Sequence, residues 1–70
     1  MKAIVEGVEV TVGDVVNFKC DIEQSGVITA IKKTYAGTSL TLESKYGFHG
    51  DYIGGDTVHT ELARDCWLAN

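Results

Sequence analysis

Hydrophobic and polar residues alternate in several short stretches of this chain, as they do in β-strands with one buried face. VEVTV, at residues 8–12, places its three valines on one face. VVNFKC, at residues 15–20, places Val16, Phe18 and Cys20 on one face, and SLTLES alternates in the same way. Together with the β-branched stretches VITAIKK and TVHTEL, this pattern predicts five strands, over residues 8–12, 15–20, 27–33, 39–44 and 57–62.

Glycine and polar residues separate the predicted strands. Gly13 and Asp14 give the first turn, and we expect DIEQSG, at residues 21–26, to reverse the chain before the third strand. TYAGT supplies a hairpin loop at residues 34–38. The third strand has apolar residues on both faces, which a β-bulge or a covered face explains. Five short strands joined by glycine turns are typical of a small all-β barrel.

The C-terminal stretch ARDCWLAN fits two local structures. Leu62 and Cys66 are four residues apart, which suits a short helix, whereas a tight turn over residues 63–65 would deliver the next residues to the sheet as a last strand. Because neighbours in a strand point to opposite faces, either Trp67 or the residues on each side of it face the core.

The length and composition indicate one small domain over residues 1–70. The chain is 44% hydrophobic and 23% charged, which is typical of globular rather than disordered proteins. It has no run of about 18 apolar residues and no secretory signal. We therefore expect a cytoplasmic protein, in the host cytoplasm if it is viral, with no membrane partner. The net charge of −4 argues against holding nucleic acid by bulk electrostatics.

Cys20 and Cys66 are the only cysteines, and they are too far apart in sequence for a typical metal motif. They are either two buried free thiols or a disulfide between neighbouring strands. His49 and His59 complete an inventory of two cysteines and two histidines, but neither pair has the short spacing of a zinc site. We therefore expect no metal and no cofactor.

The order of these segments resembles a known family. The succession VGDVVNFK, SGVITAIKK, SLTLES and DCWL is similar to a Src-homology-3-like small β-barrel of the Tudor and KOW kind. The sequence is also similar to small phage-encoded accessory proteins. The resemblance covers residues 8–68, and it implies a five-stranded Src-homology-3-like small barrel with a short helical turn before the last strand. Its motifs follow from the architecture, so the resemblance is one of fold.

The glycine-rich stretch GFHGDYIGGDTVHT, at residues 47–60, contains the longest loop. Its glycines do not have the spacing of a phosphate-binding loop, and its carboxylates do not alternate as in a calcium loop. As a connector, it would cover an open end of the barrel with its aromatic side chains. As a binding loop, it would display them to a partner. We expect Tyr52 or Ile53 to be pinned against the barrel and the tip at His49 and Gly50 to be free.

These features predict a non-catalytic protein-binding module that docks through an aromatic loop. The predicted partner-binding residues are Tyr35, Tyr46, Phe48, His49 and Tyr52. Tudor modules surround a methylated cation with aromatic rings, so the resemblance implies a similar cluster if the hairpin tip and the long loop meet. The expected partner is a protein, and a host protein if the chain is phage-encoded. The chain itself is expected to be a monomer or a weak homo-oligomer.

Two other classes of function are weaker. The alternative is a KOW-like nucleic-acid-binding module. Residues 24–50 contain Lys32, Lys33 and Lys45 but only one acidic residue, Glu43, so these lysines form a small basic patch. Catalysis is the weakest class, because no motif brings the histidines, serines and carboxylates together. We therefore predict no catalytic residues and no enzymatic activity.

Overall fold

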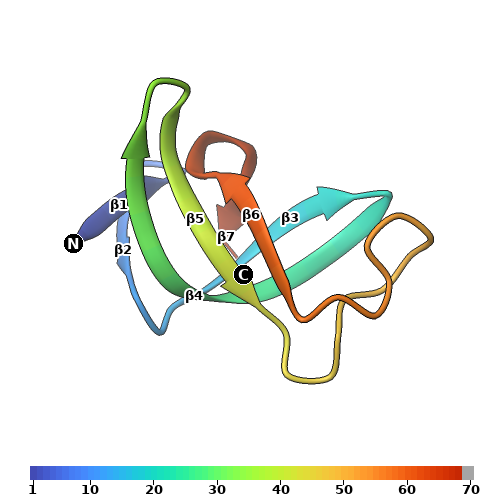
Figure 1. The fold of residues 1–70 in the computed structure, drawn as a ribbon. Helices are drawn as coiled ribbons and strands as arrows, with labels where there is room; N and C mark the ends of the chain where they lie inside the picture. The colour runs from blue at the N-terminus through green and yellow to red at the C-terminus, as the bar shows by residue number, and fades with distance from the viewer. Residues whose placement is uncertain (69–70) are drawn as a thin grey trace.

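Antiparallel strands form most of the structure, a computed structural model that describes residues 1–68 (Figure 1). The elements are β1 (Lys2–Val5), β2 (Val8–Thr11), β3 (Val15–Cys20), β4 (Ile22–Thr34), β5 (Gly37–Glu43), β6 (Val58–Leu62), the 3-10 turn η1 (Ala63–Asp65) and β7 (Trp67–Leu68). β1 and β2 form a two-stranded sheet, and the other five strands form a second sheet in the order β6-β5-β4-β3-β7. In the described part of the chain, no helix has the length and apolar character needed to cross a bilayer.

The long strand β4 organises the larger sheet. It has 13 residues, of which the first half pairs with β3 and the second half with β5. The register with β5 shifts between Ile28 and Ala30, so the intervening Thr29 forms a bulge that bends the strand (Figure 1). This bulge confirms one of the two explanations for the apolar residues on both faces of VITAIKK.

The prediction of a closed five-stranded barrel is wrong in strand number and in closure. Within residues 1–68 there are seven strands in two sheets, and the edge strands β6 and β7 do not pair with each other. The first strand was missed because the outward residue Ile4 is apolar like its buried neighbours Ala3 and Val5, so KAIV does not alternate in sequence. Glu6 and Gly7 both have positive φ, as in the two-residue turn that best joins antiparallel strands.

The prediction that residues 21–26 reverse the chain is also wrong, because residues 22–26 belong to β4. Cys20 pairs directly with Ile22, so the reversal takes place at Asp21 alone, which has a φ of 71°. An aspartate tolerates this conformation better than most residues other than glycine. The strand pattern was hidden because Gln24 and Gly26 occupy inward positions that apolar residues usually fill.

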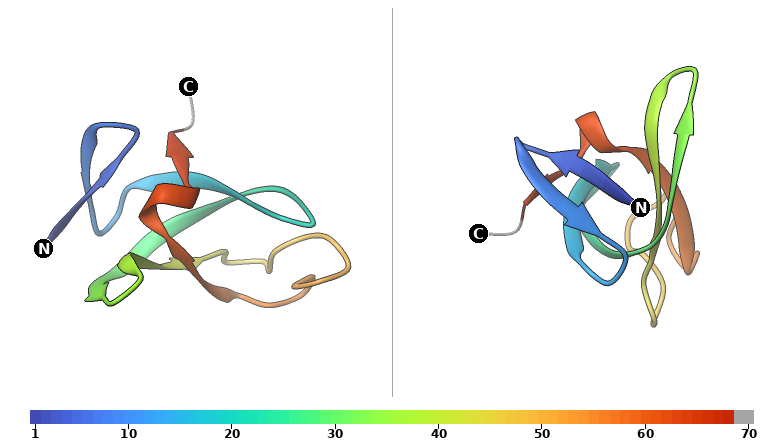
Figure 2. Two further views of the ribbon diagram at one scale, coloured as in Figure 1. Left: turned by 90° about the horizontal axis from the view of Figure 1, so that it is seen from above. Right: turned by 90° about the vertical axis from the view of Figure 1, so that its left-hand side faces the viewer.

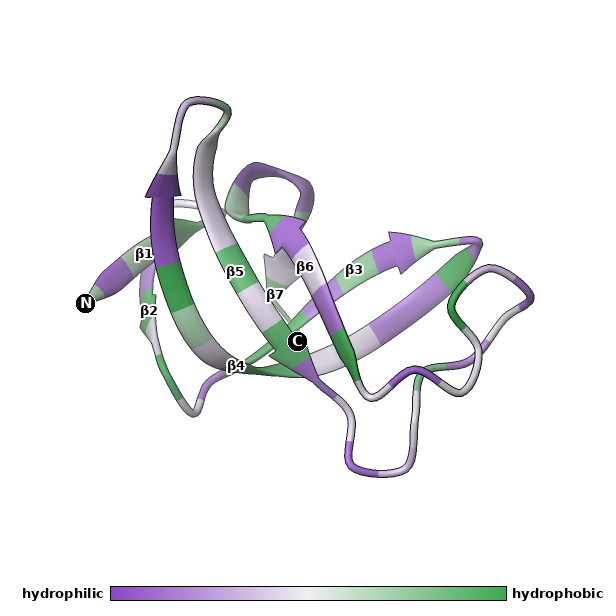
Figure 3. Cartoon of the chain, viewed as in Figure 1, coloured by the Kyte–Doolittle hydropathy of each residue, from purple (hydrophilic) through white to green (hydrophobic). Residues whose placement is uncertain are grey.

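The core lies on the concave side of the bent sheet. In β5 the hydrophobic Leu40 and Leu42 alternate with polar neighbours, whereas β4 has apolar residues next to each other in its middle, and there burial rather than hydropathy alternates (Figure 3). The N-terminal hairpin β1–β2 covers one end of this core, and the loop of residues 44–57 covers the other end (Figure 2). The buried apolar residues are Ala3, Val5, Val10, Val16, Phe18, Ile28, Leu40, Leu42, Phe48, Ile53, Ala63 and Cys66.

The C-terminal segment combines both structures that its sequence allowed. The short helical turn before the last strand is confirmed as η1, and β7 follows it and pairs with β3. Cys66 is buried and Leu68 packs against the core, whereas Trp67 points to the opposite face of the sheet. Residues 69 and 70 of the predicted segment lie outside the described residues.

Two side chains connect segments that are distant in the sequence. The Glu6 carboxylate, in the β1–β2 turn, accepts a hydrogen bond from the Leu68 backbone N–H at 2.7 Å. The Arg64 guanidinium, in η1, donates a hydrogen bond to the Ala36 carbonyl at the tip of the β4–β5 hairpin. The N-terminal hairpin is thereby joined to β7, and η1 to the central hairpin.

Glu6→Ala is expected to lower the free energy of unfolding by about 1 kcal/mol, because it removes a charge-assisted hydrogen bond to β7. Glu9→Ala is the matched control in the same hairpin. It removes an exposed pair with Lys2 and should cost about 0.3 kcal/mol. Urea unfolding of the two variants tests this, and equal losses would contradict the role given to Glu6.

Candidate functional site

The loop of residues 44–57, called the β5–β6 loop below, consists of two hydrogen-bonded turns. In the first turn, the Gly47 N–H donates to the Ser44 carbonyl at 3.1 Å. In the second, the Phe48 N–H donates to the Asp56 carbonyl at 2.7 Å and the Gly55 N–H donates to the Phe48 carbonyl at 2.9 Å. Backbone hydrogen bonds within the loop therefore hold its two turns together.

Close approach of the backbone explains two glycines of this loop, Gly47 and Gly54. A Cβ atom at Gly54 would lie 2.1 Å from the carbonyl oxygen of Gly50, a separation that no side chain can occupy. Gly47 has a φ of +91°, and a Cβ there would lie 3.1 Å from the Gly55 carbonyl oxygen. These glycines thus allow the two arms of the turn to pack against each other.

Phe48 fixes the β5–β6 loop to the core. Its side chain is only 3% exposed, and its ring meets that of Phe18 edge to face with centroids 5.4 Å apart. It also lies over Gly26 of β4, where ring carbons would be 3.4 Å from an added Cβ. The expectation that Phe48 is displayed to a partner is therefore corrected, because this ring fills the end of the core.

Polar groups also hold the tip of the β5–β6 loop. The buried amide of Gln24 donates to the Cys20 carbonyl at 3.0 Å, and its oxygen accepts the His49 N–H at 2.8 Å. Asp21 accepts the Asp51 N–H at 2.9 Å. The expectation of a tip without contacts at His49 and Gly50 is wrong, since β4 supplies a partner there. Of the two residues expected to be pinned, Ile53 is buried and Tyr52 is exposed.

Two tyrosine rings project from this anchored loop. Tyr46, in the first turn, is 90% exposed, and Tyr52, in the second, is 84% exposed. The Lys45 ammonium lies 5.5 Å from the centre of the Tyr46 ring, close enough for a cation–π contact. His49 is exposed as well. The loop therefore presents aromatic and charged side chains to solvent from a fixed backbone.

Tyr35 does not belong to this group. It is fully exposed at the tip of the β4–β5 hairpin. Both ribbon figures place that tip at the opposite end of the molecule from the β5–β6 loop (Figures 1 and 2). The hairpin tip and the loop do not meet, so the structure does not form an aromatic cluster from Tyr35, Tyr46 and Tyr52.

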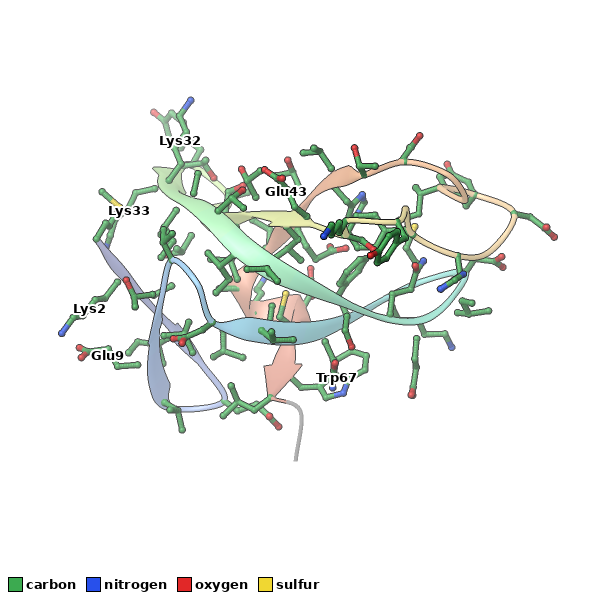
Figure 4. The ribbon with its side chains drawn as sticks, turned by 90° about the horizontal axis from the view of Figure 1, so that it is seen from below. Lys2, Glu9, Lys32, Lys33, Glu43 and Trp67 are labelled. Carbon is green, nitrogen blue, oxygen red and sulfur yellow. The ribbon has the colours of Figure 1, made fainter. Side chains whose placement is uncertain are left out.

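The three predicted nucleic-acid-binding lysines are also separated. Lys32 and Lys33 lie opposite Ser39 and Thr38 near the tip of the hairpin (Figure 4). Lys45 follows the other end of β5, about seven residues of extended strand away. Arg64, which the sequence reading did not select, reaches the hairpin tip instead.

A shallow groove of about 210 Å³ lies on the outer side of the sheet, where the chain leaves β5. Its lining residues are Val15, Ser25, Gly26, Val27, Glu43, Ser44 and Lys45, and we call it the valine groove. Sequence reasoning missed it. The signal was present in the adjacent apolar pairs of VVNF and GVIT, where one residue of each pair must point outward.

His59 and Glu61 form a half-buried pair on β6. The His59 ring stacks on Phe18 with centroids 5.0 Å apart, and its Nε2 atom lies 3.0 Å from Glu61 Oε2. Among residues 1–68, no hydrogen bond joins either histidine ring to a serine or cysteine side chain, and no group of three or more potential metal ligands is found. The His59 ring thus packs on the core residue Phe18.

Both cysteines are free thiols, so the structure does not contain the disulfide considered above. Cys66 is buried and donates a weak hydrogen bond to the Leu62 carbonyl at 3.4 Å. Burial raises the pKa of the Cys66 thiol to about 12, and the negative charges of Glu61 and Asp65 add to this effect. The thiol is therefore protonated at neutral pH, which makes it a poor nucleophile.

Gly54→Ala is expected to lower the free energy of unfolding by about 3 kcal/mol, because its Cβ would overlap the Gly50 carbonyl oxygen. Gly55→Ala is the control. Gly55 has a φ of +89° but open space around it, so the cost should be about 1 kcal/mol of backbone strain. Thermal unfolding of both variants measures the difference. Equal stabilities would show that the two arms of the turn do not approach as closely as described.

Raising the pH is expected to destabilise the protein through Cys66. Between pH 9 and pH 12 the unfolded chain loses the thiol proton that the folded protein keeps, so the free energy of unfolding falls as the pH rises. Below pH 9 the thiol is protonated in both states and contributes no pH dependence. Urea unfolding over this range should show a steeper decline for the wild type than for Cys66→Ala. Parallel declines would contradict the raised pKa.

No protein-family model matches the chain, and neither a curated protein nor a solved structure matches it. The similarity to Tudor and KOW modules and to phage accessory proteins therefore stays a prediction from the sequence. The function of the chain has to be inferred from its own residues and their geometry.

Proposed function

We propose that the protein is a non-catalytic protein-binding module that docks through Tyr46 and Tyr52 of the β5–β6 loop. The observation that carries this proposal is the contrast within one loop. Phe48 and Ile53 are buried, whereas the two tyrosines are 90% and 84% exposed. The same short segment thus anchors itself in the core and offers two large rings to solvent.

The anchoring favours binding because it lowers the entropy lost on association. Tyrosine is enriched at the energetic centres of interfaces, and its ring has few rotatable bonds to immobilise. The loop backbone is already fixed by hydrogen bonds within the loop and by its bonds to Gln24 and Asp21. A partner therefore orders the side chains of Tyr46 and Tyr52 but not the loop, which improves affinity.

The charges around the tyrosines define the chemistry of the partner surface. Asp51 and Asp56 lie in the same loop, Asp21 lies beside its tip, and Lys45 is next to Tyr46. The net charge of the whole chain is −4. A partner surface with apolar recesses for two rings and surrounding basic groups is complementary to this loop. If the chain is phage-encoded, as the sequence resemblance implies, that partner is a host protein.

The Src-homology-3-like relationship is part of the same proposal. A single sheet in which one long bent strand pairs with both neighbours, followed by a 3-10 turn and a short last strand, supports it. Small all-β scaffolds of this kind carry their binding residues on loops held by a rigid sheet. The β5–β6 loop is in such a position.

A nucleic-acid-binding function has less support. Lys32, Lys33 and Arg64 at the hairpin end are three cations beside the exposed Tyr35, but Lys45 lies away from them. Three phosphate contacts give weak binding, and the acidic net charge opposes it.

Tyr46 and Tyr52 are expected to contact the partner, and Tyr35 is not. The photo-crosslinking amino acid p-benzoylphenylalanine, placed at one of the three positions at a time, should capture the same protein from positions 46 and 52 in a lysate of the native cells. Position 35 is the matched control, because it is at least as exposed but lies at the tip of the β4–β5 hairpin, at the opposite end.

Affinity for the captured protein provides the quantitative test. Tyr46→Ala with Tyr52→Ala should weaken binding by about 30-fold or more, as expected for two interface anchors. Tyr35→Ala should leave the affinity unchanged. Unchanged binding by the double variant, or an equal loss in Tyr35→Ala, would refute the proposal.

A further inference from the structure

The first part of β4 pairs with β3 on one side but has no strand beside it on the β5 side. The ladder between β4 and β5 ends at Val27 opposite Glu43, although β4 begins five residues earlier at Ile22. From Ser44 onward the chain turns away into the β5–β6 loop. The valine groove occupies the resulting gap between β4 and the start of this loop.

The backbone of Ser25 faces this gap. The Ile28 N–H donates to the Asp14 carbonyl, and the Ile28 carbonyl accepts the Gly13 N–H, so the main-chain groups of Ile28 point toward β3. Main-chain groups of successive strand residues point to alternate sides. Those of Val27 therefore point toward β5, and those of Ser25 point in the same direction, past the last paired residue.

The main-chain groups of Ser25 are available for a new bond. In residues 1–68, the ladder with β5 stops before Ser25, and none of the backbone hydrogen bonds outside the ladders involves it. Its hydroxyl is occupied, because it donates to Asn17 at 2.6 Å. The free groups of Ser25 are thus one N–H donor and one C=O acceptor, which is the pair that an added strand bonds.

Apolar side chains stand next to these free groups. Val15 and Val27 face each other across β3 and β4 and point outward, with 48% and 40% of their surfaces exposed. Glu43, the cross-strand neighbour of Val27, and Lys45 also line the groove. Two apolar side chains, two charged side chains and a main-chain donor and acceptor therefore meet in one place.

We infer that the valine groove receives an extended segment of the protein partner, which adds beside β4 through main-chain hydrogen bonds to Ser25. This inference rests on the proposed function and identifies the form in which the partner binds. One aliphatic side chain of the segment packs on Val15 and Val27. A basic residue faces Glu43, and an acidic residue faces Lys45.

The size of the groove favours a peptide over a small ligand. Its volume of about 210 Å³ is below the 300 to 1,000 Å³ typical of pockets for cofactors and drug-sized molecules. It suits a single side chain instead. In β-strand addition, main-chain bonds provide affinity while pockets for alternate side chains provide specificity. Lys45 lines the groove and contacts the ring of Tyr46, so the same partner can reach both the groove and Tyr46.

Linear peptides selected from a displayed random library on the wild-type protein are the probe. The selected peptides should carry aliphatic residues at alternate positions, and we expect Val27→Asp to weaken their binding by about tenfold or more. Val58→Asp is the matched control. Val58 is 51% exposed in the same cross-strand row, opposite Glu43, but it does not line the groove.

The main-chain contact is tested separately. Ser25→Pro removes the N–H that faces the groove, and no β3 ladder bond is lost because that N–H does not point toward β3. This variant should lose peptide binding, whereas Ser25→Ala should retain it. Methylation of single backbone nitrogens in the peptide should also lower the affinity by about tenfold at one central position. That measurement does not depend on how the Ser25→Pro protein folds.

The outcomes separate this inference from the proposed function. Failure to select any peptide, or peptides that bind Val27→Asp and Val58→Asp equally well, would overturn the inference. Insensitivity to backbone methylation at every position would also overturn it. If crosslinks from positions 46 and 52 still form in any of these cases, the binding function stands and only the groove is excluded. If those crosslinks fail as well, both are refuted.

Discussion

The packing of Phe48 against Phe18 is the contact on which the rest of the structure depends. Phe48 comes from a long loop and Phe18 from β3, so their contact fixes a segment that the strand ladders do not reach. The ring also covers Gly26, which leaves space for it in β4, and it meets His59 of β6. One aromatic ring thus closes the end of the core that the open sheet would expose.

The fixed loop has consequences on both of its sides. Its inner residues replace the strand that would close a barrel, and Gln24 satisfies the backbone at its tip. Its outer residues, Tyr46 and Tyr52, are left largely exposed to solvent. Because the chain departs from β5 to form this loop, the main-chain N–H and C=O of Ser25 have no partner on the β5 side within residues 1–68. The exposed rings and the valine groove therefore have the same structural origin.

The other end of the molecule is closed by different means. There the hairpin β1–β2 covers the core, and Glu6 joins it to the last strand. Arg64 holds the tip of the central hairpin through Ala36. This end has a few charged links and a single exposed tyrosine, whereas the loop end has two tyrosines and a groove on a fixed backbone. The features suited to recognition are concentrated at the loop end.

Local pattern was enough to predict the class of the fold and most of its strands. The alternation of Val16 with Phe18 and of Leu40 with Leu42 depends only on the two-residue period of a strand, and both pairs are buried. The same period did not reveal β1, because its outward residue Ile4 is apolar and hides the alternation, or the first half of β4, because Gln24 and Gly26 face inward there. Their inward places are explained by His49 and Phe48, which are distant in sequence.

The candidate site likewise has features that the sequence predicts and features that only the tertiary structure sets. The sequence by itself determined that aromatic residues are concentrated in a glycine-rich loop, because composition and glycine spacing are local properties. Only the tertiary structure decided that Phe48 is buried while Tyr46 and Tyr52 are exposed, that Tyr35 is remote from them, and that Val15 and Val27 border a groove. The physical reason is that burial depends on which distant segments pack together, and a strand pattern specifies the face of each residue but not the neighbour that covers it.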